Sequence, residues 1–86
     1  MNFIGSLDKL RGRENYPTWK FAVKSYLEHE ELWDAVLGKE DDAKKVTKAR
    51  TKIIMLLEPS IFVHVQECKS AKDVWDTLSK NLKTLV

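Results

Sequence analysis

Glycine and proline, which interrupt helices, and cysteine, which can cross-link a chain, are scarce in this sequence. The 86 residues include three glycines, two prolines and one cysteine. Because Cys68 is alone, no disulfide can form within the chain, which fits a reducing compartment. Three scattered glycines cannot build a glycine-rich phosphate-binding loop. The few glycines and prolines instead lie where helix boundaries are expected.

Long apolar runs and an excess of one charge are also missing. No stretch approaches the roughly 20 apolar residues that span a bilayer, and residues 1–8 lack the features of a signal peptide. The 15 basic and 13 acidic residues leave a net charge of +2. That balance does not by itself imply a nucleic-acid or membrane partner. We therefore expect a soluble, cytoplasmic protein with no membrane contact.

What the chain does contain is enough apolar material for one core. Hydrophobic residues make up 43% of the sequence, with three tryptophans among them. A chain of this length forms one domain at most. Glycines in residues 1–14 argue against a long helix there. We predict an N-terminal arm over 1–14, ending in a loop at 11–14, and a helical lobe over 15–86.

Two helices are predicted in the first half of the lobe. Asn15 can cap the first helix, with Tyr16 fixing the entering chain and Pro17 at the first position, where its missing N–H has no partner to lose. A short second helix begins near Leu32 and ends at Gly38, a favoured C-terminal cap. Apolar residues recur at helical spacing in both: Trp19, Ala22, Val23, Tyr26 and Leu27, then Leu32, Trp33, Val36 and Leu37.

The third predicted helix is the longest. Asp41 or Asp42 can cap its start, and Pro59 ends it because the residue before a proline avoids helical geometry. Its apolar stripe consists of Ala43, Val46, Ala49, Ile53, Leu56 and Leu57.

Two shorter helices are predicted to follow. The fourth runs through Val65, although the β-branched residues 61–65 leave a strand as an alternative that would have nothing to pair with. The fifth begins with a capping box from Ser70 to Asp73 and continues without a stop signal, so we expect the natural chain to extend further. Its stripe consists of Val74, Trp75, Leu78, Leu82 and Leu85. The predicted fold is all-α, a compact bundle of about five helices with an N-terminal arm.

No constellation of catalytic or metal-binding residues is visible. His29 and Glu30 begin like the zinc motif H-E-x-x-H, but Trp33 stands where the second histidine belongs. His64 and Cys68 lie four residues apart and could meet on a helix, although a half-buried thiol and a surface imidazole are the simpler interpretation. We therefore expect no enzymatic activity, no metal and no cofactor.

One face of the third helix is basic. Lys44, Lys45, Lys48 and Lys52 could contact RNA phosphates. The simpler interpretation is a solvated face, partly balanced by the acidic residues 40–42. No aromatic residue lies between these lysines, so a stacking platform for single strands is missing. We expect RNA binding by these 86 residues to be weak or absent.

The tryptophans fall on apolar stripes, so core packing is their expected role. The alternative is that one of them lies at an assembly interface, where tryptophan is enriched. The predicted core contains Trp19, Val23, Tyr26, Trp33, Ile53, Leu57, Trp75 and Leu78. The predicted interface residues are Leu82, Leu85, Phe3 and Ile4.

Three segments resemble signatures of copia-type LTR retrotransposon Gag proteins, especially those of insect copia elements. Residues 10–21 resemble the first signature, with one more residue between Gly12 and Asn15 than its shortest form. Residues 32–36 resemble the second and residues 71–78 the third, in the same order. The resemblance covers nearly the whole chain. It implies a helical N-terminal capsid lobe, whereas the family's zinc knuckle and enzymes have no counterpart here.

The function that this resemblance implies is non-enzymatic self-association in retrotransposon particles, with other Gag chains as partners. The alternative is a domesticated Gag-derived domain that binds a host protein or peptide.

Overall fold

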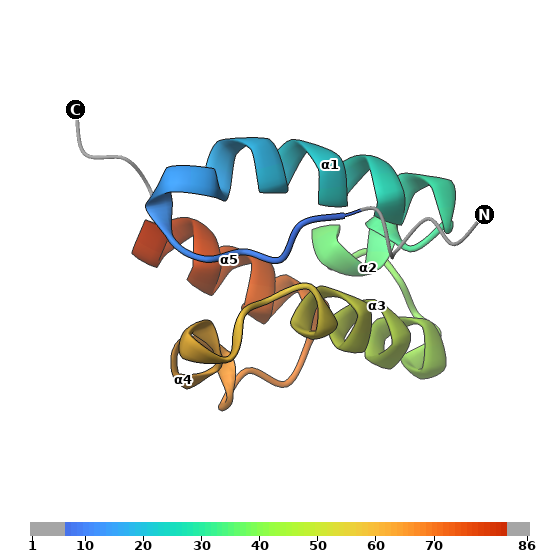
Figure 1. Cartoon of the computed structure of the whole chain (residues 1–86). Coiled ribbons are helices and arrows are strands. Elements are labelled where there is room, and N and C mark those ends of the chain that lie inside the picture. Colours follow the sequence, from blue (N-terminus) through green and yellow to red (C-terminus); the bar gives the residue numbers. More distant parts are fainter. Residues whose placement is uncertain (1–6, 83–86) are drawn as a thin grey trace.

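The computed structural model describes residues 7–82 and confirms the predicted all-α bundle (Figure 1). Every regular element in this range is a helix. The elements are the 3-10 helix η2 (Arg13–Asn15), α1 (Tyr16–His29), α2 (Trp33–Leu37), α3 (Ala43–Met55), the 3-10 helix η3 (Pro59–Ile61), α4 (Phe62–Val65) and α5 (Ala71–Leu82).

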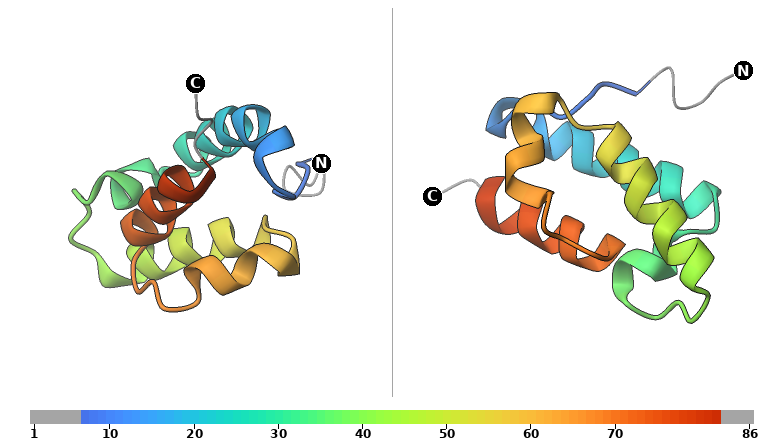
Figure 2. Two further views of the ribbon diagram at one scale, coloured as in Figure 1. Left: turned by 90° about the vertical axis from the view of Figure 1, so that its left-hand side faces the viewer. Right: turned by 90° about the horizontal axis from the view of Figure 1, so that it is seen from below.

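Helix α5 holds the bundle together. It packs against α2, α3 and α4, and it lies between α1 and the α3–α4 segment in Figure 1 and in the left view of Figure 2. Its apolar stripe is buried along the whole helix, from Ala71 through Trp75 to Leu82. The last helix in the sequence therefore supplies the central surface on which the others assemble.

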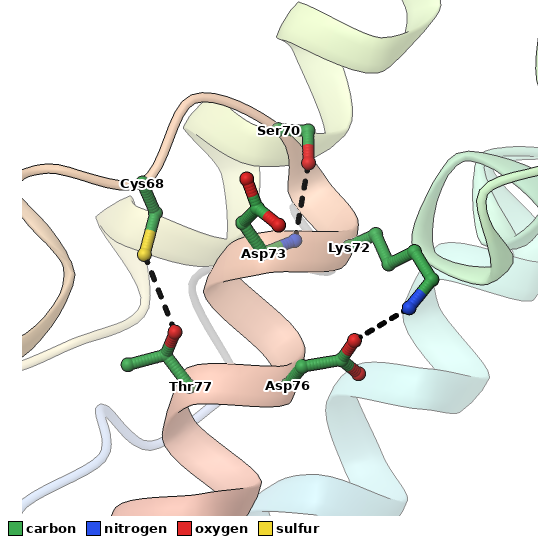
Figure 3. Close-up of polar contacts among 6 residues, drawn as sticks. All are labelled: Cys68, Ser70, Lys72, Asp73, Asp76 and Thr77. Carbon is green, nitrogen blue, oxygen red and sulfur yellow. Dashed lines mark hydrogen bonds and ion pairs between the residues drawn. The ribbon is translucent and has the colours of Figure 1, made fainter.

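Local signals place three helix boundaries as the sequence predicts. Asp42 caps α3, because its Oδ1 accepts a hydrogen bond of 2.9 Å from the Lys44 N–H. Ser70 Oγ likewise accepts from the Asp73 N–H at 3.1 Å at the start of α5 (Figure 3). Gly38 ends α2 in the left-handed conformation, with φ of 78°.

The predicted cap at Asn15 is wrong, because its side chain turns toward the arm. Its Oδ1 accepts from the Arg11 N–H at 2.9 Å and the Gly12 N–H at 3.4 Å, and its Nδ2 donates to the Lys9 carbonyl at 2.9 Å. The preceding turn η2 also places Pro17 at the second helical position rather than the first. Asn15 therefore fixes the loop that enters α1.

The third helix ends earlier than predicted, at Met55 rather than next to Pro59. Leu10 of the arm pairs with the backbone just after this helix. Its N–H donates to the Leu56 carbonyl and its carbonyl accepts from the Glu58 N–H, both at 2.9 Å. This pairing takes the backbone groups that another helical turn would have used. The short fourth helix follows as η3 and α4, so the alternative of a strand over 61–65 is wrong.

Candidate interaction surface

Four aromatic rings from three separate parts of the chain meet where α1, α2 and α5 come together. Trp19 stacks on Trp75 with ring centroids 5.7 Å apart, and Tyr16 stacks on Trp19 at 6.2 Å. Trp33 meets Trp75 edge to face at 5.2 Å. Such ring pairs add stabilisation beyond the area they bury. The tryptophans of the three segments that resemble Gag signatures therefore belong to one cluster, which joins α1, α2 and α5.

Trp19 also ties this cluster to the arm. Its Nε1–H donates a hydrogen bond of 2.9 Å to the Leu56 carbonyl, which also accepts from the Leu10 N–H. The bond is buried, so it is shielded from water. One carbonyl at the end of α3 thus holds both α1 and the arm.

The structure buries most of the residues that the sequence assigned to the core. Trp33 differs from the rest: it is partly exposed and packs against the edge of the core. The buried residues of that set are Trp19, Val23, Tyr26, Ile53, Leu57, Trp75 and Leu78.

Of the four predicted interface residues, the structure describes one, and that one is buried. Leu82 is 8% exposed and belongs to the core, so it offers almost no surface to a partner. It is buried because the stripe of α5 faces the other helices over the full length of α5. Phe3, Ile4 and Leu85 lie outside the described residues.

The basic face of α3 is smaller than the sequence suggested. Lys44, Lys45 and Lys48 are exposed, but Lys52 turns toward α1. Its Nζ donates to Tyr26 Oη at 2.7 Å and lies 3.3 Å from Glu30 Oε1. The pKa of Lys52 is raised overall. The hydrogen bond with Tyr26 is the largest cause; burial lowers the pKa, and the nearby Glu30 raises it again. Lys52 therefore links two helices instead of extending a surface for RNA.

The His64–Cys68 pair does not form on one helix. Helix α4 ends at Val65, and the Cys68 Sγ lies 3.4 Å from Thr77 Oγ1 (Figure 3). The Cys68 carbonyl accepts a hydrogen bond of 2.9 Å from Arg50 Nε, which joins this loop to α3. Across residues 7–82, no three His, Cys, Asp or Glu side chains are grouped so that they could hold a metal ion.

Several large apolar side chains lie on the surface, and sequence analysis missed them. Phe21 on α1 is 75% exposed, Val63 is 64% exposed and Met55 is 59% exposed. The spacing of Phe21 held the signal, because it does not fit the stripe of Trp19, Val23 and Tyr26. A single exposed apolar residue is ordinary, but a phenylalanine exposed to this degree is a candidate contact for a partner.

One shallow pocket adjoins the arm. Its volume is about 200 Å³, and it is lined by Leu7, Asp8, Asn15, Thr18, Trp19 and Ala22. The amide of Asn15, one of the lining residues, already forms hydrogen bonds with the loop backbone.

None of the helices between residues 7 and 82 has the length and apolar character needed to cross a bilayer.

Comparison with protein families gives a match in the first half of the chain. Residues 12–37 match a domain of unknown function, DUF4219, which is found in retrotransposon Gag-like proteins. The matched segment comprises η2, α1 and α2, and it contains Tyr16, Trp19 and Trp33 of the aromatic cluster. No curated protein and no solved structure matches the chain significantly.

Proposed function

We propose that this chain is a non-enzymatic, copia-type Gag capsid domain that associates with itself or with other Gag chains during cytoplasmic particle assembly. The match of residues 12–37 to a domain found in Gag-like proteins is the observation that carries the proposal. The matched segment supplies three of the four rings of the aromatic cluster.

Two features of the molecule support this role. Trp75, from the third Gag-like segment, lies in the same cluster, although it is outside the matched residues. Apolar side chains on the surface, above all Phe21, provide contact area for another chain. Capsid contacts are weak one by one, and repetition in a shell makes them effective.

Sedimentation velocity tests this proposal on the 86-residue chain. Between about 10 µM and about 1 mM, the range in which weak protein contacts form, the weight-average sedimentation coefficient should rise. The rise should be reversed on dilution, as mass action requires. A constant monomer boundary over the whole range would contradict self-association, and it would favour an adaptor that binds a different, host-encoded protein.

A further inference from the structure

The outer face of α1 has no partner within the described chain. Phe21 has the largest exposed fraction of the large apolar residues at 75%, and Pro17 and Ser25, one turn away on either side, are exposed as well. Helix α1 lies at the edge of the bundle, with its other side on the core (Figure 1 and the left view of Figure 2). Within residues 7–82, this face is therefore accessible along its length.

The charges along this face change sign between the middle of α1 and its C-terminal end. Lys20 and Lys24 lie in the middle of α1, whereas Glu28 lies near its end and Glu31 just after it. All four side chains are exposed, and none has an ion-pair partner within residues 7–82. Basic and acidic charges are thus separated on one surface and unpaired.

Ring contacts hold the two lysines along the helix. Lys20 Nζ lies 5.7 Å from the centre of the Tyr16 ring, and Lys24 Nζ lies 5.3 Å from that of Trp33. Both rings belong to the aromatic cluster. Because the cluster positions these ammonium groups, the charge pattern is part of the folded structure.

We propose that two copies of this chain associate through α1 in an antiparallel, two-fold arrangement. In that arrangement the lysines of one copy face Glu28 and Glu31 of the other, and each Phe21 packs against the outer face of the partner's α1. A two-fold contact requires a self-complementary surface, which a face with lysines in the middle of the helix and glutamates at its C-terminal end provides. This inference rests on the proposed self-association and names the surface that performs it.

The same charge pattern argues against a polyanion as the occupant. An RNA strand along this face would meet Glu28 and Glu31 as well as the lysines. The contact between the two helices is also short, because 14 residues of α-helix span about 21 Å. The dimer should therefore be weak and concentration-dependent.

Charge reversal tests the arrangement. One variant carries Lys20→Glu and Lys24→Glu, and the other carries Glu28→Lys and Glu31→Lys. In a dimer of either variant, side chains of like charge would face each other across the contact. We therefore expect dimerisation at least about tenfold weaker than in the wild type by sedimentation equilibrium. An equimolar mixture of the two variants should restore the dimer, because one face is then acidic and the other basic.

A matched control changes the same charges on another exposed helix. Lys44→Glu with Lys48→Glu on α3 should leave dimerisation within about twofold of the wild type, since surface substitutions away from the contact have small effects. Circular dichroism of every variant checks that the helices remain folded.

The possible outcomes separate this inference from the proposed function. Wild-type self-association that persists in both α1 variants would overturn the α1 surface and leave the capsid role standing. A wild-type chain that stays monomeric would overturn both. Open-ended oligomers in place of dimers would contradict the two-fold arrangement, and variants that weaken association without restoration in the mixture would contradict the charge pairing.

Discussion

Trp75 illustrates how one side chain can connect several segments. It is 8% exposed, and its ring contacts Trp19 of α1 and Trp33 of α2. These three tryptophans come from three different segments that resemble Gag signatures. The indole therefore stabilises the fold by joining helices that are distant in sequence, and it needs no chemical reactivity for this role.

Trp75→Ala should lower the free energy of unfolding by about 3–5 kcal/mol, the usual cost of removing a large buried ring. Since small domains have about 5 kcal/mol in total, much of the population should unfold. Thermal melting by circular dichroism measures the effect. Phe21→Ala is the control: it removes a ring that is 75% exposed and should change stability by about 0.5 kcal/mol or less. Similar melting curves for both variants would refute the core assignment.

The side chains that the sequence could not place have partners that helical spacing does not reveal, either in an irregular loop or on another helix. Asn15 has a good capping position, yet its amide bonds the loop backbone at Lys9, Arg11 and Gly12. Lys52 has the spacing of a surface lysine, yet it reaches Tyr26. For the candidate site, Phe21 could have been found because it breaks the spacing of its helix, but its 75% exposure becomes visible only after α1 has packed.

Helix boundaries were predictable where a local group determines them. The Asp42 and Ser70 side chains and the left-handed Gly38 act on backbone groups within a few residues. The end of α3 was not predictable, because Leu10 of the distant arm pairs with the backbone there. Nor was the turn between α1 and α2, where Glu31 adopts φ of 61° without being a glycine.

Gly38 offers a test of one such boundary. Gly38→Ala should destabilise the fold by about 1 kcal/mol, because a side chain disfavours the left-handed φ of 78°. The added Cβ would also approach Lys72 Cδ to 2.9 Å, although that flexible side chain can move. Gly38→Asn should cost less, since asparagine tolerates this conformation. Urea unfolding compares the two variants, and equal losses would show that crowding at Lys72, not the backbone angle, controls this site.

The link between α1 and α3 should depend on pH. The hydrogen bond with Tyr26 raises the pKa of Lys52, so the folded state binds this proton more tightly than the unfolded state does. A raised pKa contributes stability that is present below about 10.5, the ordinary lysine value, and is lost as the pH rises through the folded-state pKa.

Lys52→Met, which keeps most of the apolar stem, should therefore be less stable than the wild type at neutral pH. The difference in free energy of unfolding should shrink as the pH rises above about 10.5. Urea titrations across this range measure it. A difference that stays constant at alkaline pH would show that Lys52 acts by packing rather than by its charge.

For the whole molecule, the buried and exposed aromatic residues have different roles. The clustered tryptophans join three segments around one core, and the outer face of α1 carries Phe21 beside charges of both signs that form no ion pair within residues 7–82. Folding and association should therefore respond to different substitutions. This separation is the central claim, because it lets the domain fold through its core and associate through its surface.

The most direct test measures association and stability of Phe21→Ala together. Sedimentation equilibrium should show association weakened about tenfold, a typical effect of removing an exposed aromatic contact. The melting temperature of the same sample should stay within a few degrees of the wild type, as expected for an exposed position. Wild-type association in this variant, or a loss of stability as large as that of Trp75→Ala, would contradict the account.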